Sequence, residues 1–243
     1  MKEQYVGDIN DYRKYALLRA LAGDGKIRIG VCWMLTPPDG STDGNKTAYL
    51  DHPQNWRRFD PQLFDLLRSV SKVGGHERLI HLERSEVIPH ADYFNDMVPD
   101  AMITREDYFA SALDSLKNVD LIFFDPDNGL DVPSKPKGRK DSSKFVYRDE
   151  VGLAFSRGHS ILIYQHFPRE DRTTFVERIG LDLSVVTGAP FVWDFRTADV
   201  VFFLLIHSHH ADILRERASA AASLWGPSFI SGNPLQAEVP VTN

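Results

Sequence analysis

The chain has 243 residues, of which 42% are hydrophobic and 26% charged, and its net charge at pH 7 is −6. This composition is typical of one globular domain and excludes fibrous and disordered proteins. The longest apolar stretches, 119–124 and 200–206, are much shorter than the ~20 residues of a membrane-spanning helix. The chain starts without an apolar signal segment, and its single cysteine, Cys32, excludes an internal disulfide. We therefore expect a cytoplasmic protein that does not bind membranes.

Amphipathic and apolar segments alternate along the chain and predict alternating helices and strands. The first helix is predicted over 8–22, because Tyr12, Tyr15, Leu18 and Leu21 recur close to helical spacing. The later predictions, in chain order, are a strand over 27–35, a loop over 36–47, a helix over 60–71, a helix over 108–116 that follows a capping box at 104–107, a strand over 119–124, a loop over 133–144, a helix over 147–156, a strand over 160–164, a helix over 169–179, strands over 190–195 and 199–207, and a helix over 211–224.

This order predicts one α/β domain over 1–231, followed by a flexible tail over 232–243. The strands are continuous apolar runs, which favours a mostly parallel, Rossmann-like sheet with helices on both faces. The short gap between the last two strands predicts an antiparallel hairpin at one edge. Such sheets bind ligands at the carboxyl ends of their strands, so the residues that follow the strands are the first candidates for a site.

The clearest candidate is Asp125-Pro126-Asp127-Asn128, which follows a buried strand. Pro126 cannot continue a central strand, so the polar side chains fall at the edge of the sheet. Carboxylate and amide oxygens either accept hydrogen bonds from an amino group or ligate Mg²⁺ or Mn²⁺. We predict Asp125, Asp127 and Asn128 as catalytic residues. The structural alternative is a turn whose aspartates cap backbone donors.

The strand predicted over 160–164 also ends in polar residues, Tyr164-Gln165-His166. In a parallel sheet these residues lie at the same edge as Asp125. Tyr164 can stack on a base and Gln165 can hydrogen-bond to it, so both are predicted to bind substrate. His166, with an ordinary pKa of about 6.5, is a candidate general base, although a lone histidine here is more often structural.

A basic loop follows the acidic motif, within the predicted loop over 133–144. It is either a solvated run of charge or a segment that contacts the phosphates of a nucleic acid. Because the chain as a whole is acidic, any binding of nucleic acid requires a local basic patch of this kind. The candidate substrate-binding residues of the loop are Lys135, Lys137, Arg139 and Lys140.

The first predicted helix carries Asp8 and Asp11 near its start, where the helix dipole favours acidic residues. That structural role does not explain Lys14, which falls among apolar residues and can reach a carboxylate or a phosphate-bearing ligand. The run His207-Ser208-His209-His210 lacks metal-site spacing and is interpreted as a strand end and helix cap. The chain has no glycine-rich nucleotide signature and no serine-hydrolase motif.

Over about 5–210 the chain resembles class I S-adenosylmethionine-dependent methyltransferases, most nearly the ribosomal RNA adenine-N6 enzymes. Those enzymes carry an aspartate, a lysine and an aromatic residue in an N-terminal helix, and a D-P-P-[YFW] motif after the fourth strand. The resemblance implies a methyltransferase-type sheet, in which Asp125 accepts hydrogen bonds from the target amine. It also implies S-adenosylmethionine as cofactor, held by four residues of the first segment: Tyr5, Asp8, Asp11 and Lys14.

The chain departs from the family in two places. Asp127 and Asn128 replace the second proline and the aromatic residue of the motif, and Pro37-Pro38-Asp39-Gly40 stands where the family has its cofactor-binding glycine loop. We expect an enzyme that acts on nucleic acid, with amino-methyl transfer to a base as the leading reaction. Two alternatives remain, a Mg²⁺- or Mn²⁺-dependent nuclease or glycosyl/phosphoryl-transfer enzyme that uses Asp125 and Asp127, and a non-catalytic nucleic-acid-binding module.

Overall fold

The structure is a computed structural model, and it describes residues 1–2, 6–37, 46–73 and 77–235. Within these residues, no helix is long and apolar enough to cross a membrane.

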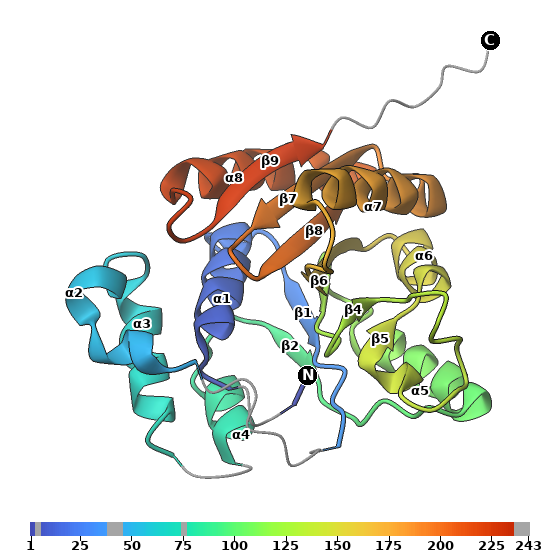
Figure 1. Cartoon of the computed structure of the whole chain (residues 1–243), viewed down its shortest axis with the longest axis horizontal. Coiled ribbons are helices and arrows are strands. Elements are labelled where there is room, and N and C mark those ends of the chain that lie inside the picture. The colour runs from blue at the N-terminus through green and yellow to red at the C-terminus, as the bar shows by residue number, and fades with distance from the viewer. Residues whose placement is uncertain (3–5, 38–45, 74–76, 236–243) are drawn as a thin grey trace.

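The fold is built on a seven-stranded sheet with the strand order β2-β1-β3-β6-β8-β7-β9 (Figure 1). β2, β1, β3 and β6 are parallel, and β8 runs antiparallel to both of its neighbours, β6 and β7. A separate pair, β4 and β5, lies beside the sheet. The predicted Rossmann-like sheet with its closing antiparallel hairpin is thus confirmed. The strands are β1 Ile29–Cys32, β2 Asp92–Phe94, β3 Leu121–Phe124, β4 Gly129–Leu130, β5 Phe145–Val146, β6 Ser160–His166, β7 Phe191–Arg196, β8 Val200–Ile206 and β9 Ser231–Leu235.

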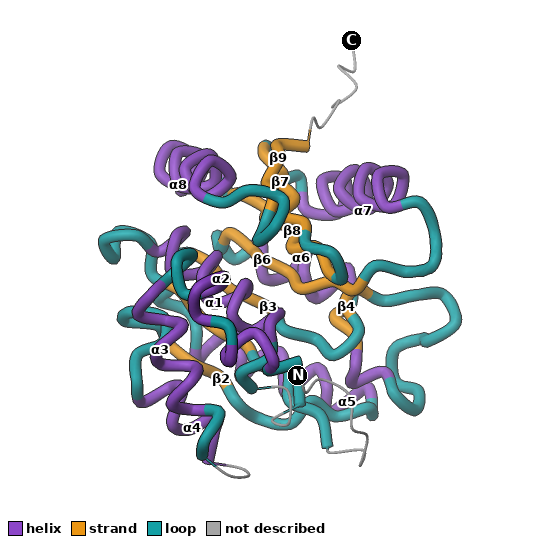
Figure 2. Tube along the Cα trace, turned by 60° about the vertical axis from the view of Figure 1, so that its left-hand side comes forward, coloured by secondary structure: helices purple, strands orange, loops and turns teal. Residues whose placement is uncertain are grey.

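Helices cover both faces of the sheet, as expected. α1, α3, α4 and α8 contribute to the core on one face, and α5, α6 and α7 to the core on the other. Figure 2 shows α8 and α7 on opposite sides of the strands near β7 and β9. The helices are α1 Ile9–Ala22, α2 Pro53–Trp56, α3 Pro61–Val70, α4 Glu77–Arg84, α5 Met102–Ser115, α6 Arg148–Ser156, α7 Arg172–Thr187 and α8 Ala211–Leu224.

The central strand β3 is buried on both faces, which explains its unbroken apolar sequence. Leu121 and Phe123 belong to the core below α1, whereas Ile122 and Phe124 belong to the core below α5. Successive side chains of a strand point to opposite faces, so a strand between two helical layers needs apolar residues at every position.

Several boundaries differ from the sequence predictions. β1 has only four residues, Ile29–Cys32, and the rest of the predicted strand contributes an isolated bridge from Leu35 to Met97. The capping box expected at 104–107 is wrong: α5 begins at Met102, so these residues lie inside the helix. α7 ends later than predicted, at Thr187. Residues 232–235, expected in the tail, pair with β7 as part of β9, while 236–243 lie outside the described residues.

The register of the parallel strands determines where the polar residues meet. Cys32 pairs with Phe124, and Phe124 pairs with Ile163, so β1, β3 and β6 end side by side. The residues that follow Phe124 therefore lie next to Tyr164, as the sequence predicted.

Candidate functional site

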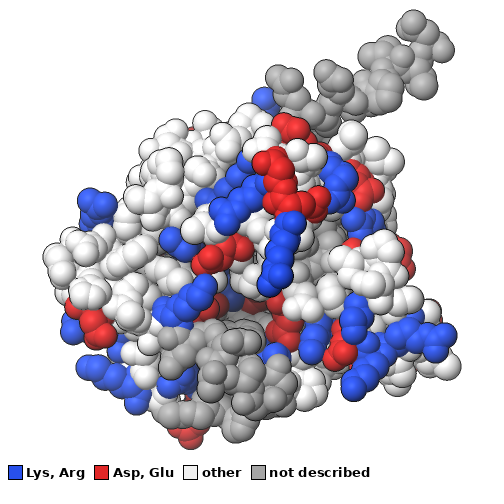
Figure 3. All heavy atoms as spheres, in the orientation of Figure 1, with Lys and Arg blue, Asp and Glu red and all other residues white. Residues whose placement is uncertain are grey.

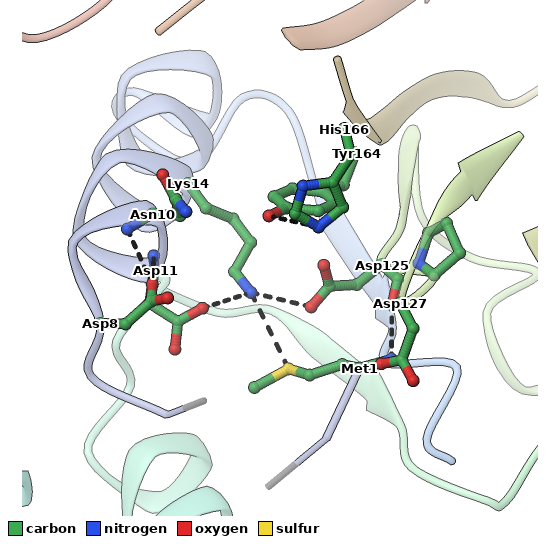
Figure 4. Close-up of a pocket in the computed structure, with 10 residues that line it drawn as sticks. Met1, Asp8, Asn10, Asp11, Lys14, Asp125, Asp127, Tyr164 and His166 are labelled. Carbon is green, nitrogen blue, oxygen red and sulfur yellow. Dashed lines mark hydrogen bonds and ion pairs between the residues drawn. The ribbon is translucent and has the colours of Figure 1, made fainter. Parts of the chain in front are cut away.

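A small polar cavity of about 40 Å³ lies at the carboxyl ends of β3 and β6, against the start of α1 (Figure 4). The loop after β3 supplies Asp125 and Asp127 to its lining, β6 supplies Tyr164 and His166, and α1 supplies acidic and amide groups together with Lys14. The cavity thus joins residues that are more than 100 positions apart in the sequence.

Lys14 is the central cation of this cavity. Its Nζ lies 2.6 Å from Oδ1 of Asp11 and 2.8 Å from Oδ2 of Asp125, and its side chain is 3% exposed. Burial alone lowers the pKa of this ammonium, but the two carboxylates outweigh burial and raise the pKa above its ordinary value. Lys14 therefore stays charged and holds Asp125 in one orientation.

Asp8 forms the N-cap of α1. Its Oδ1 accepts hydrogen bonds from the backbone N–H groups of Asn10 at 2.7 Å and Asp11 at 2.9 Å. This cap explains why the helix begins here, and it fixes Asp11 one turn before Lys14. Burial and the charge of Asp11 raise the pKa of Asp8 to about 7. Asp8 therefore changes its protonation near neutral pH.

Hydrogen-bond acceptors outnumber donors in the lining. Oδ1 of Asn10 is buried and has no hydrogen-bond partner. Asp127 accepts a hydrogen bond from Oγ1 of Thr36 at 2.5 Å, and its Oδ1 lies 3.1 Å from the amino group of Met1. Four carboxylates thus line the cavity, together with the ammonium of Lys14 and the amino group of Met1. A cavity of this charge and composition favours a ligand group that donates hydrogen bonds.

Tyr164 and His166 form the wall opposite α1, since residues two apart on a strand share a face. The hydroxyl of Tyr164 lies 3.3 Å from Nε2 of His166. His166 is exposed at the surface, but the surrounding protein desolvates its imidazole and lowers the pKa below its ordinary value. His166 is therefore neutral at pH 7 and is able to accept a proton.

Gln165 points to the other face of the sheet, away from this cavity. Its Oε1 accepts a hydrogen bond from the backbone of Leu130 at 2.7 Å, and its Nε2 donates to the backbone oxygen of His166. Gly129 has φ +107° and packs against the amide of Gln165, where any Cβ would collide with it. This contact connects β6 to the loop that carries Asp125, so Gln165 stabilises the position of that loop from the face of the sheet opposite the cavity.

The other predicted site residues lie apart from the cavity. Asn128 is exposed, and its backbone N–H donates to the oxygen of Lys144. In the basic loop, Lys135 pairs with Asp141, and Lys137 pairs with Asp149 and Glu150. Tyr5 lies outside the described residues. Arg139 and Lys140 are exposed and make no ion pair with any side chain that the structure describes.

Sequence reasoning missed Asn10 and Thr36. Asn10 lies one helical turn before Lys14, so the i, i+4 spacing within the acidic segment was the available signal. No pattern indicated Thr36, because it reaches Asp127 from the segment after β1, 91 residues earlier in the chain.

The lining was compared with the two groups that the sequence suggests. For a divalent cation, no cluster of three or more His, Cys, Asp or Glu side chains within the described ranges has a suitable geometry. Asp125 and Asp127 each already contact an ammonium group. For S-adenosylmethionine, the acceptors suit its cationic groups, but a nucleoside-sized ligand needs a pocket of roughly 300 Å³ or more. The described residues therefore fit neither a metal ion nor the whole cofactor.

Comparisons with known proteins do not supply a function. No family model matches the chain, and searches of curated proteins and of solved structures found no match.

Proposed function

We propose that this chain is an enzyme that acts on nucleic acid and binds the exocyclic amino group of a base beside Asp125. The observation that carries the proposal is the cavity at the end of β3, in which Lys14 orients a buried carboxylate among unsatisfied acceptors. An amino group offers two N–H donors and fits a cavity of about 40 Å³, whereas the rest of the base would remain at the mouth.

Asp125 is the residue that would touch the reacting nitrogen. A carboxylate that accepts an N–H hydrogen bond raises the electron density on the amine and stabilises positive charge that develops there. Lys14 acts as a positioning residue, because it holds Oδ2 of Asp125 at 2.8 Å. His166 lies at the opposite wall and is available to accept a proton.

Methyl transfer to this amine is the reaction that the resemblance to adenine-N6 methyltransferases implies. Asp125-Pro126 after a buried strand and the closing β7–β8 hairpin support it. The metal-dependent alternative is less favoured, because a cation would have to displace an ammonium group from each aspartate. The basic loop remains a candidate for phosphate contacts.

The test uses pairs of single-stranded oligonucleotides that differ in one amino group: adenine against purine, guanine against hypoxanthine, and cytosine against its 4-deoxy analogue. We expect the wild-type protein to bind one amino-bearing member about 10- to 100-fold more tightly, since a hydrogen bond to a charged group contributes about 1.5–3 kcal/mol. Asp125→Asn should lose this discrimination. Because the described residues do not fit the whole of S-adenosylmethionine, transfer of labelled methyl from it to the preferred oligonucleotide is a separate test, and it decides whether methyl transfer is the reaction.

Asp194→Asn is the matched control. Asp194 is also a fully buried carboxylate in an ion pair, with Arg196, but it does not line the cavity. This variant should keep the wild-type discrimination even if it lowers stability. Equal wild-type affinity within all three pairs would overturn the proposal, and binding without discrimination would instead favour the non-catalytic module.

A further inference from the structure

Arg13 is a buried cation that forms no ion pair with any carboxylate among the residues that the structure describes. It lies on α1 beside Asn10, and only 7% of its surface is exposed. Its Nε has no hydrogen-bond partner, and no carboxylate of the described residues lies within ion-pair distance of its guanidinium. Its guanidinium carbon lies over the ring of Trp56, 5.7 Å from the ring centroid.

Two other arginines that are buried or half-buried, Arg105 and Arg19, are paired. Arg19, on the same helix, contacts Asp60 at 2.7 Å, and Arg105 contacts Glu150 at the same distance. Burial lowers the pKa of Arg13, and Asp199 and Asp8 offset this only at longer range. A buried charge that lacks a partner is costly, so such a residue is expected where a ligand supplies the opposite charge.

We propose that Arg13 binds a phosphate group at the mouth of the cavity. The inference rests on the proposed function in one respect: the phosphate would belong to the nucleic-acid strand whose base enters the cavity. A guanidinium presents a planar fork of N–H donors that matches phosphate oxygens. Stacking on Trp56 leaves the edge of this fork available to such a ligand.

The surroundings of Arg13 suit an anion. Lys46 is exposed, and its Nζ lies 3.0 Å from Oδ2 of Asp199, so the nearest exposed carboxylate already has its own cation. The backbone oxygen of Asp199 accepts a hydrogen bond from Phe167 at 3.3 Å, directly after His166, which lines the cavity, so Asp199 and its partner Lys46 lie near the cavity rim. Figure 3 shows basic and acidic side chains mixed around the hollow on this face.

The test is the thermal stability of Arg13→Met with inorganic phosphate as the probe. In chloride buffer we expect this variant to be as stable as the wild type or more stable, because it removes an unpaired buried charge. When phosphate replaces chloride at the same ionic strength, the wild type should gain stability and the variant should not. Phosphate affinity, measured by calorimetry, should fall at least about tenfold in the variant.

Two further variants separate binding from structure. Arg13→Lys keeps the charge and should retain part of the phosphate effect. Arg58→Met removes an arginine that stacks on Phe59 at 4.9 Å and should behave like the wild type. The proposal is overturned if phosphate fails to stabilise the wild type, or if Arg13→Met is destabilised equally in both buffers.

Failure of the proposed function gives a different result. A phosphate effect that depends on Arg13, with no discrimination among the oligonucleotide pairs, would retain this subsite and reject the base-amine function. Discrimination among the pairs without a phosphate effect would retain the base-amine function and reject the phosphate subsite at Arg13. With a single-stranded oligonucleotide, Arg13→Met should also reduce the slope of log affinity against log salt by about 0.7.

Discussion

Two buried ion-pair centres among the described residues, around Arg105 and around Lys14, differ in how completely their polar groups are satisfied. In the first, the guanidinium of Arg105 contacts both carboxylate oxygens of Glu150, at 2.7 and 3.0 Å. It also donates to the backbone oxygens of Ser142 and Phe145. The Glu150 carboxylate also pairs with Lys137 at 3.1 Å and accepts a hydrogen bond from the backbone of Tyr147, so both of its oxygens have partners. This centre fastens α5 to α6 and to the loop before β5.

The second centre, around Lys14, has more acceptors than donors. Asp11 and Asp125 share one ammonium, Asn10 keeps an unpaired oxygen, and a cavity adjoins the group. Full satisfaction is what a structural ion pair requires. A surplus of buried acceptors beside a cavity, in contrast, is what a site for a hydrogen-bond donor requires. The Arg105 centre is therefore structural, whereas the Lys14 centre is the candidate binding site.

The largest effect on stability is expected for Arg105→Met. This change removes the buried guanidinium from the Glu150 carboxylate, which keeps contacts only to Lys137 and the Tyr147 backbone, and leaves two buried carbonyls without their donor. We expect a loss of about 3–5 kcal/mol in the free energy of unfolding, measured with urea. The double variant with Glu150→Met should recover most of that loss. Base-amine discrimination should be unchanged, and a single variant as stable as the wild type would contradict the structural role.

Lys14→Met is expected to have the next largest effect, about 3 kcal/mol at pH 8. The loss of unfolding free energy caused by Lys14→Met should shrink as the pH falls. Burial already raises the pKa of Asp11, so this carboxylate can bind a proton in the folded state once Lys14 is absent. Urea unfolding at pH 5 and pH 8 measures this difference. The double variant with Asp125→Asn should be less sensitive to pH, and a loss independent of pH would show that the carboxylates do not respond to Lys14.

A smaller effect is expected for Asp8→Asn. Asp8 has an ordinary pKa of 3.8 and a pKa of about 7 in the folded protein, so the folded state binds more protons between these values. The contribution of Asp8 to stability therefore falls as the pH rises from about 4 to about 7. Asn also caps helices well, so Asp8→Asn should remove this part of the pH profile and keep α1.

The control for Asp8 is Asp171, which caps α7 through the backbone N–H of Thr174. The exposed carboxylate of Asp171 has a lowered pKa because of that hydrogen bond. The contribution of Asp171 to stability is present above its ordinary pKa and is lost as the pH falls, so its pH dependence has the opposite sign to that of Asp8. Identical profiles for the two Asn variants would contradict the inferred environment of Asp8.

The smallest change in stability, within about 0.5 kcal/mol, is expected for the pair Arg139→Gln and Lys140→Gln, because both side chains are exposed. If the basic loop contacts phosphates, the salt slope of oligonucleotide binding should fall by about 1.4. Lys117→Gln with Arg157→Gln, which precede β3 and β6, removes two charges at the other end of these strands and should leave the slope unchanged. An unchanged slope in both pairs would identify the loop as a solvated run of charge.

The sequence by itself determined the elements with strong local signals. Unbroken apolar runs specified β3 and β8, and the Asp8 cap with its periodic aromatic residues specified α1. The sequence also predicted that Asp125 lies next to Tyr164, because the carboxyl ends of parallel strands meet at one edge of the sheet. Short elements such as β2 and β9 were missed, since three to five residues carry little periodicity and depend on their neighbours for pairing.

Only the tertiary structure decided which candidates belong to the site. Gln165 lies on the opposite face of the sheet because successive residues of a strand alternate in direction, and Lys137 forms an ion pair with Asp149. Neither residue lines the cavity. The partners of Lys14 lie on its own helix and more than 100 residues away, so no local pattern identifies both. The burial that raises the pKa of Asp8 and encloses Nε of Arg13 without a hydrogen-bond partner likewise depends on the packed fold, because it arises from segments that are distant in sequence.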